Sequence, residues 1–158
     1  MPILETRTQH WPDEAACADS ARALARHAGL DDAYIELHGP LGAGKTTFAR
    51  HLLHALGVEG RVKSPTYAVM EPHKAAFGGT PFAVWHFDFY RFNDPQEWED
   101  AGFRDLFASR GLKLAEWPDK AAGLLPDADL RIHIDPLEGD ARTVRLVAHT
   151  GRGAELLA

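Results

Sequence analysis

The sequence predicts an α/β fold with a mostly parallel central sheet, antiparallel edge strands and a C-terminal hairpin. Apolar strand-like runs alternate with segments of helical periodicity, which is typical of a sheet covered by helices. A Gly-rich stretch at residues 39–46 lies between such a strand and a helix. The 158 residues are 45% hydrophobic and 25% charged, which is ordinary for one globular domain spanning residues 1–158.

The amino-terminal part of the chain alternates strands with helices. Residues 3–6 are a candidate edge strand, and a helix opens at residues 11–14, where Pro and acids favour a first turn. We expect this helix to end at Gly29. An apolar strand at residues 34–38 leads into the Gly-rich stretch, and apolar residues at helical spacing then continue from residue 45 to residue 57.

Turn residues and alternating patterns predict the elements of the carboxyl-terminal part. A strand ending near Glu71 and a strand at residues 82–88 flank a turn at residues 78–81, and the short connection favours a hairpin. The remaining predicted elements are a helix capped by Asp94, a further helical turn after Gly102, a strand at 112–116, a short helix after Pro118, and strands at 130–134 and 143–148.

Residues 39–46 match the phosphate-binding pattern G-x-x-x-x-G-K-[ST], with a strand before them and a helix after them. This context refines the fold class to a P-loop NTPase-like three-layer domain. Backbone N–H groups of such a loop, at the positive end of a helix, cradle a polyphosphate. The loop residues expected to bind the nucleotide are Gly39, Gly42, Ala43, Gly44, Lys45, Thr46 and Thr47. The alternative is a Gly-rich turn that contains Lys and Thr by chance.

Three side chains of this loop have distinct expected roles. Lys45 would reach the β- and γ-phosphates, and the Thr46 hydroxyl would face Mg²⁺. Thr47 has a similar polar reach toward the α-phosphate. The sequence therefore predicts ATP or ADP and Mg²⁺ as ligands.

Two acids follow strands that could end beside the loop. Asp88 closes the strand at residues 82–87, and Glu116 closes the strand at residues 112–115. Ligands of open α/β sheets collect at the carboxyl ends of the strands, so both carboxylates can lie beside Thr46. The alternative is that either acid merely caps the segment after its strand.

Several other polar residues have two possible interpretations. Ser64 and Thr66 lie either in an ordinary turn or in a segment that responds to the γ-phosphate. Arg91 either neutralises phosphate or forms a surface ion pair, and Trp117 either stacks or packs in the core. The histidines lack the paired spacing of a zinc site, so we expect surface or packing roles for them.

Charge and cysteine content bear on partners and location. The formal net charge of −6 argues against broad contact with DNA or RNA phosphates, which depends on clustered Lys and Arg. The single cysteine, Cys17, cannot form an internal disulfide and is expected to be a small buried hydrophobe. No apolar run approaches the roughly 20 residues needed to span a bilayer. We therefore expect a cytoplasmic protein without a membrane contact.

The motifs, taken in order, resemble those of the TsaE family of bacterial ATPases of tRNA threonylcarbamoyladenosine biosynthesis. The resemblance covers nearly the whole chain, from about residue 10 to about residue 150, and the joint pattern is more specific than a phosphate loop alone. The motifs that carry it are residues 39–47, 62–67, 86–91 and 116–118, followed by Leu125-Pro126.

The resemblance implies an ATP-binding, Mg²⁺-dependent and weakly ATP-hydrolysing subunit that joins the TsaB and TsaD proteins. That complex installs threonylcarbamoyl on the adenosine beside the anticodon of certain tRNAs. By resemblance, the subunit meets tRNA only through the complex and does not transfer the carbamoyl group. Hydrolysis resets the complex for further turnovers.

The resemblance also implies roles for individual residues. Lys45 holds the phosphates, Thr46 and Glu116 match the Mg²⁺ positions, and Asp88 matches the acid that helps to activate water. The residues that match positions near the nucleotide are Ser64, Thr66, Trp117, Glu14 and Arg142. Pro40 stands where an acid is common, Phe89 where Leu is common, and residues 73–81 read as a long turn, but none of these departures removes a functional group.

Other classes of nucleotide-binding protein share the loop. A small-molecule kinase would use Asp88 to accept a substrate proton, but it needs an Arg-bearing lid, for which Arg104 and Arg110 are sparse candidates. A guanine-nucleotide switch typically carries Asn-Lys-x-Asp, which this chain lacks. A subunit that binds nucleotide without hydrolysing it is a further alternative.

Overall fold

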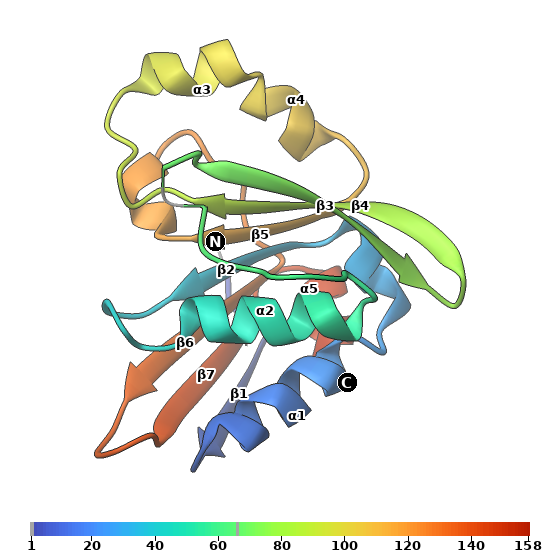
Figure 1. The fold of residues 1–158 in the computed structure, drawn as a ribbon, viewed down its shortest axis with the longest axis vertical. Helices are drawn as coiled ribbons and strands as arrows, with labels where there is room; N and C mark the ends of the chain where they lie inside the picture. The colour runs from blue at the N-terminus through green and yellow to red at the C-terminus, as the bar shows by residue number, and fades with distance from the viewer. Residues whose placement is uncertain (1, 66) are drawn as a thin grey trace.

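The computed structural model describes residues 2–65 and 67–158, which form an α/β fold on one mixed seven-stranded sheet (Figure 1). The order of the strands in the sheet is β1-β7-β6-β2-β5-β4-β3. The elements are β1 (Glu5–Trp11), α1 (Glu14–Leu24), η1 (Ala28–Asp32), β2 (Tyr34–His38), α2 (Lys45–Ala55), β3 (Met70–Phe77), β4 (Thr80–Asp88), α3 (Pro95–Ala101), α4 (Phe103–Ala108), β5 (Leu112–Glu116), η2 (Pro118–Ala121), β6 (Leu130–Pro136), β7 (Arg142–Ala148) and α5 (Gly151–Leu156), where η marks a 3₁₀ helix.

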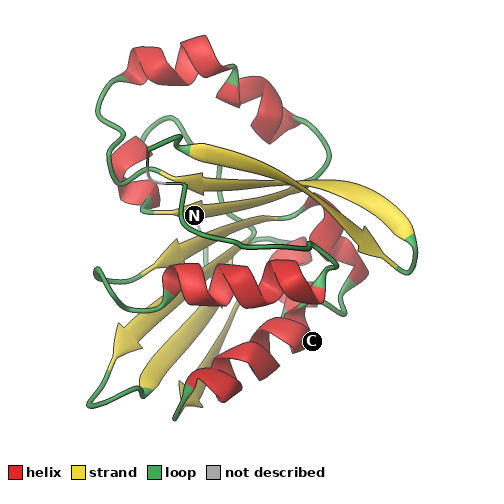
Figure 2. Ribbon diagram, viewed as in Figure 1, coloured by secondary structure: helices red, strands yellow, loops and turns green. Residues whose placement is uncertain are grey.

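Parallel pairing is confined to the middle of the sheet. Strands β6, β2, β5 and β4 pair in parallel, so their carboxyl ends meet at one edge. The outer pairings are antiparallel, with β1 on β7, β7 on β6, and β3 on β4. Figure 2 shows these strands as one twisted layer, with the long β3–β4 hairpin at one side. The predicted hairpins at the edge and near the C-terminus are confirmed.

Alternation along the central strands sends apolar side chains to both faces of the sheet. On β2 and β5, Ile35, Leu37 and Leu114 join the core that also contains buried residues of α1 and α2. Tyr34 and Ala115 point to the other core, which contains Trp98 of α3 and Phe103 of α4 among aromatic neighbours. Helices therefore cover both faces and hold the parallel strands in the interior.

Four elements differ from the sequence-based expectation. Strand β1 runs from Glu5 to Trp11 rather than over residues 3–6, because it pairs along its whole length with β7. Helix α1 ends at Leu24, and Gly29 lies within the separate 3₁₀ helix η1. The strand predicted to end near Glu71 and the long turn predicted at residues 73–81 are both misplaced, since β3 begins at Met70 and runs to Phe77, and a tight turn at Gly78-Gly79 joins it to β4. Helix α5 was not predicted.

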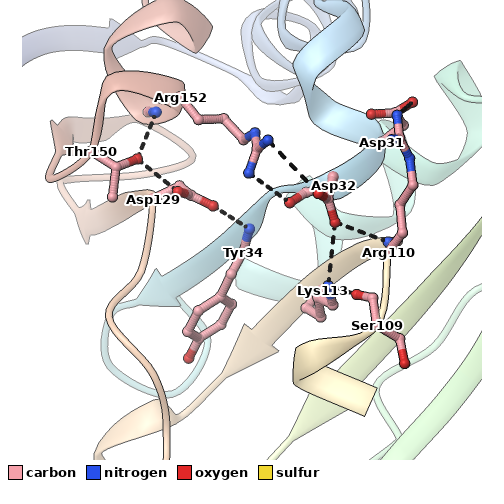
Figure 3. A network of polar contacts seen from close by, with 11 residues as sticks. Asp31, Asp32, Tyr34, Ser109, Arg110, Lys113, Asp129, Thr150 and Arg152 are labelled. Carbon is pink, nitrogen blue, oxygen red and sulfur yellow. Dashed lines mark hydrogen bonds and ion pairs between the residues drawn. The ribbon is translucent and has the colours of Figure 1, made fainter. Parts of the chain in front are cut away.

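A polar network ties the amino ends of the central strands to α5 and η1 (Figure 3). The Asp129 carboxylate accepts hydrogen bonds from the Tyr34 backbone N–H at 2.8 Å and from the Thr150 hydroxyl at 2.6 Å. Arg152 donates to the Asp32 carbonyl at 3.2 Å, and the ammonium of buried Lys113 lies 3.8 Å from the Asp32 carboxylate. This network fixes the end of the sheet opposite the Gly-rich loop.

Within residues 2–65 and 67–158, the structure contains no helix with the length and apolar character needed to cross a membrane.

Candidate functional site

The Gly-rich loop connects β2 to α2 and is shaped by glycines in conformations that other residues rarely adopt. Gly39 has φ +153°, and an added Cβ there would lie only 2.5 Å from the carbonyl oxygen of Ile134 on β6. Gly44, with φ +108°, precedes α2 and provides no side-chain cap. The first N–H groups of a helix lack intrahelical partners, so those of α2 remain available at the loop. A cavity of about 280 Å³ lies against residues 41–47 of this loop.

Lys45 is folded back over the loop that it follows. Its ammonium donates to the carbonyls of Gly39 at 2.6 Å and Pro40 at 3.0 Å, and lies 4.2 Å from the centre of the Trp117 ring. Burial lowers the pKa of Lys45 from its ordinary value, and the carboxylates of Glu116 and Asp88 oppose this shift. The cavity therefore has a desolvated cation on its wall.

Thr46 and Glu116 meet although they are far apart in the sequence. The Thr46 hydroxyl donates to Glu116 Oε1 at 2.8 Å. Glu116 Oε2 lies 2.6 Å from His86 Nε2, and both the carboxylate and the imidazole are buried. The end of β5 thus delivers a carboxylate to the first turn of α2, as expected for the carboxyl ends of parallel strands.

Asp88 lies beside Glu116, because the two residues are register partners at the ends of β4 and β5. The Asp88 carboxylate accepts a hydrogen bond from the Tyr90 backbone N–H at 2.9 Å and another from the Ser64 hydroxyl. Both Asp88 and Ser64 line the main cavity. Thr66, the other hydroxyl of the predicted responsive segment, lies outside the described residues.

A second cavity, of about 190 Å³, adjoins the first. Both are lined by Ala43, Gly44 and Thr47, while Glu14 and Arg142 line only the second. Arg142 Nε donates to the Ala43 carbonyl at 2.7 Å, so the C-terminal hairpin supports the loop directly. Cys17 also lines this cavity, and burial raises the pKa of its thiol to about 12.

Trp117 lies at the rim of the main cavity and carries a strained backbone, with φ +55°. Its ring contacts the Tyr90 ring at 4.9 Å between centroids. The Trp117 side chain is half-buried and also packs against the aromatic core that contains Trp98 and Phe103. Arg91 has a different placement, since its guanidinium packs over the Tyr67 ring, 4.5 Å from the centroid, and donates to the Tyr67 hydroxyl.

The structure brings together predicted loop residues 42–47, Ser64, Asp88, Glu116 and Trp117, and places Glu14 and Arg142 at the adjoining cavity. Gly39 lines neither cavity, and its carbonyl accepts a hydrogen bond from Lys45. His86 is the residue that the sequence reasoning missed. The histidines were expected at the surface or in packing roles, and His86 is indeed fully buried, but its contact with Glu116 was not predicted. The available signal was strand alternation, which places residues 86 and 88 on the same face of β4.

Comparisons with known proteins identify the family of this chain. The family model for "Threonylcarbamoyl adenosine biosynthesis protein TsaE" matches residues 11–144. The chain is 38% identical to tRNA threonylcarbamoyladenosine biosynthesis protein TsaE of Haemophilus influenzae, over 98% of this chain and 97% of that one. It is 32% identical to the protein of the same name from Bacillus subtilis, over 99% and 92% of the two chains.

The fold also has a counterpart among solved structures. The crystal structure of Bacillus subtilis YdiB superposes with a TM-score of 0.78, covering 99% of this chain and 95% of that chain. At 24% sequence identity this match supports the fold alone. The family model and the two relatives, which span nearly the whole chain, show that this chain belongs to the TsaE family.

Proposed function

We propose that this chain is a Mg²⁺-dependent, ATP-binding and weakly ATP-hydrolysing subunit for threonylcarbamoylation of the tRNA adenosine next to the anticodon. The names of its relatives support the pathway. The proposal includes a P-loop NTPase-like three-layer domain, for which helices on both faces of the sheet are the support. It also includes action with TsaB and TsaD, which the family resemblance implies.

The observation that carries the proposal is the hydrogen bond of 2.8 Å between the Thr46 hydroxyl and Glu116 Oε1. It joins the first turn of α2 to the end of a neighbouring parallel strand, directly beside the Gly-rich loop. A hydroxyl and a carboxylate at that position are the protein ligands that a phosphate-bound Mg²⁺ uses. A Gly-rich turn of chance composition would not require this pairing.

The loop and the two cavities suit a nucleotide in size and chemistry. Backbone N–H groups at the start of α2 and the Lys45 ammonium would bind the phosphates in the main cavity. Lys45 now interacts with two loop carbonyls, and phosphate oxygens would replace these partners with charged ones. Glu14 and Arg142, at the adjoining cavity, would flank the nucleoside.

The residues present fit Mg²⁺ better than a metal held by protein alone. Among residues 2–65 and 67–158 there is no group of three or more His, Cys, Asp or Glu side chains that could hold a metal ion. Mg²⁺ usually takes one or two protein oxygens and completes its shell with phosphates and water, and Thr46 with Glu116 supplies such a pair. Mg²⁺ bound there would neutralise the charge of the β- and γ-phosphates.

Asp88 is the residue best suited to orient the attacking water. It lines the cavity that Lys45 and Thr46 also line, and its carboxylate is oriented by Ser64 and the Tyr90 N–H. A carboxylate held in this way can accept a hydrogen bond from water and then its proton. The threonylcarbamoyl transfer itself is assigned to the partners, and tRNA contact to the complex.

Calorimetric titration of the full chain with ATP in the presence of Mg²⁺ tests the binding site. Lys45→Ala is expected to weaken ATP binding at least about 30-fold, because removing one partner of a desolvated charge contact costs about 2 kcal/mol or more. Lys74→Ala removes an exposed lysine on β3 and serves as the matched control. Unchanged affinity in Lys45→Ala would contradict the site.

The same preparation tests hydrolysis when TsaB and TsaD are added singly and together. Asp88→Asn is expected to retain ATP binding and to lower the ATPase rate about 100-fold, as for loss of a general base. If Asp88→Asn loses binding and hydrolysis together, Asp88 has a structural role instead. Rates that do not respond to either partner would favour a free-standing enzyme.

A further inference from the structure

Both oxygens of the Glu116 carboxylate have a side-chain contact, and one of these two contacts is with a residue of the Gly-rich loop. Oε1 accepts from the Thr46 hydroxyl at 2.8 Å, while Oε2 lies 2.6 Å from Nε2 of His86. The carboxylate accepts both contacts, so the facing ring nitrogen of His86 carries the proton. Both His86 and Glu116 are almost completely shielded from solvent, with exposed fractions of 0% and 2%.

We propose that His86 is a positioning residue, which holds Glu116 in the one orientation that presents Oε1 to the metal ion. This inference rests on the proposed function, because it assigns Glu116 to Mg²⁺. A glutamate has several rotatable bonds, and fixing Oε2 selects one of its rotamers before any ligand arrives. Residues that orient a ligating carboxylate commonly change metal affinity or activity 10- to 100-fold when they are replaced.

The neighbourhood of His86 supports a positioning role over simple packing. The other ring nitrogen, Nδ1, is buried and has no hydrogen-bond partner among the described residues. His86 therefore directs its single paired nitrogen to Glu116. His86 lies on β4, which is paired on both sides, and the contact crosses directly to the neighbouring strand β5, so the sheet sets its geometry.

The experiment compares His86→Gln with His86→Asn in the full chain. A glutamine amide reaches close to the position of Nε2, whereas an asparagine amide reaches only close to Nδ1. Calorimetry measures the affinity for a non-hydrolysable ATP analogue, first in EDTA and then at increasing Mg²⁺ concentrations. The half-effective Mg²⁺ concentration is the one that produces half of the gain in analogue affinity due to Mg²⁺. His86→Leu removes the donor entirely.

The inference predicts a result specific to one ring nitrogen. His86→Asn and His86→Leu should raise the half-effective Mg²⁺ concentration about 10- to 100-fold, while His86→Gln stays within about threefold of wild type. Affinity in EDTA should be unchanged in all three variants. His73→Gln is the matched control, because His73 lies on the neighbouring strand β3 and its Nε2 is also buried without a partner among the described residues.

Two results would overturn the inference in distinguishable ways. If Mg²⁺ strengthens binding of the analogue to the wild type but His86→Gln and His86→Asn behave alike, His86 only fills space and the proposed function stands. If wild type shows no Mg²⁺-dependent binding, the proposed function fails and takes this inference with it. Should His86→Leu not fold, as judged by thermal unfolding, the comparison of Gln with Asn still decides.

Discussion

At the scale of single residues, burial and neighbouring charges can shift the pKa of a side chain. His133 on β6 is an example outside the main cavity. Its ring stacks on His38 of β2, with centroids 4.7 Å apart. Burial, followed by the charges of His38, Arg145 and Arg131, lowers the pKa of His133 to about 4, and Asp135 acts in the opposite direction.

This shift predicts a pH dependence of stability. Unfolded His133 has an ordinary pKa of about 6.5, so it binds a proton before the folded residue does. The contribution of His133 to the free energy of unfolding should be constant above about pH 6.5 and fall between about pH 6.5 and pH 4. With allowance for partial solvent screening, the part due to His133 is on the order of 1 kcal/mol.

Urea denaturation between pH 4 and pH 7 measures the effect. His133→Gln should have a shallower fall of stability across this range than wild type. His10→Gln, which changes an exposed histidine on β1, should follow wild type and serves as the control. Parallel curves for wild type and His133→Gln would contradict the prediction.

At this scale, the sequence could predict residues whose chemistry belongs to a linear motif. Lys45 and Thr46 follow from the loop pattern, and Glu116 follows from its place at the end of an apolar strand. The role proposed for His86 could not be predicted in the same way, because it depends on a contact between two neighbouring strands. Spacing along the chain does not reveal which side chains on neighbouring strands touch.

At the scale of secondary structure, patterns in the sequence located most elements but not all of their ends. Strand β2, helix α2 and strand β5 lie where periodicity predicted them. Strand β1 is longer than predicted, because its mainly exposed residues are held by pairing with β7 rather than by burial. Pairing partners distant in sequence leave no local pattern to detect.

Helix α5 shows why a local pattern can fail. It begins with Gly151 and contains Gly153, and glycines are poor helix formers. The hydroxyl of Thr150, which caps α5, accepts a hydrogen bond from the Gly153 N–H at 3.1 Å. This bond offsets part of the low helix propensity of the two glycines. A Cβ added to Gly153 would meet the Asp129 carbonyl oxygen at 1.9 Å, so this glycine permits α5 to approach the entry of β6.

Gly153→Ala should therefore destabilise the fold although alanine favours helices. The added methyl cannot be accommodated without moving α5 away from Asp129, and such overpacking costs about 1–3 kcal/mol. Gly151→Ala is the matched control in the same helix, since an added Cβ there meets no atom within 4 Å. Its stability should stay within about 0.5 kcal/mol of wild type in urea denaturation. Equal stability of the two variants would disprove the close approach.

At the scale of the whole molecule, the two ends of the parallel strands have different tasks. Their carboxyl ends carry Asp88 and Glu116 toward the loop and the main cavity. Their amino ends are joined by the network of Figure 3, which involves Asp129 and Asp32. The sheet separates the groups proposed to bind nucleotide from groups that only stabilise the fold.

The strand order could not be predicted from the sequence, because it depends on crossovers between distant segments. The chain begins at one edge with β1, yet the strand beside it is β7. The rule that ligands collect at carboxyl ends of parallel strands was sufficient to predict the proximity of Thr46 and Glu116 without that order. The proximity of these two residues was therefore more predictable than the strand order that brings them together.

This division of the sheet predicts that Asp129→Ala lowers stability and leaves nucleotide binding intact. The change removes the acceptor for the Tyr34 N–H and for the Thr150 hydroxyl, which should cost about 2–4 kcal/mol. Urea denaturation measures the loss, and calorimetry at a temperature where the variant is folded measures its affinity for ATP with Mg²⁺. Asp127→Ala changes an exposed acid two residues away and should alter neither quantity. Loss of nucleotide affinity in folded Asp129→Ala would show that the two ends of the sheet are coupled.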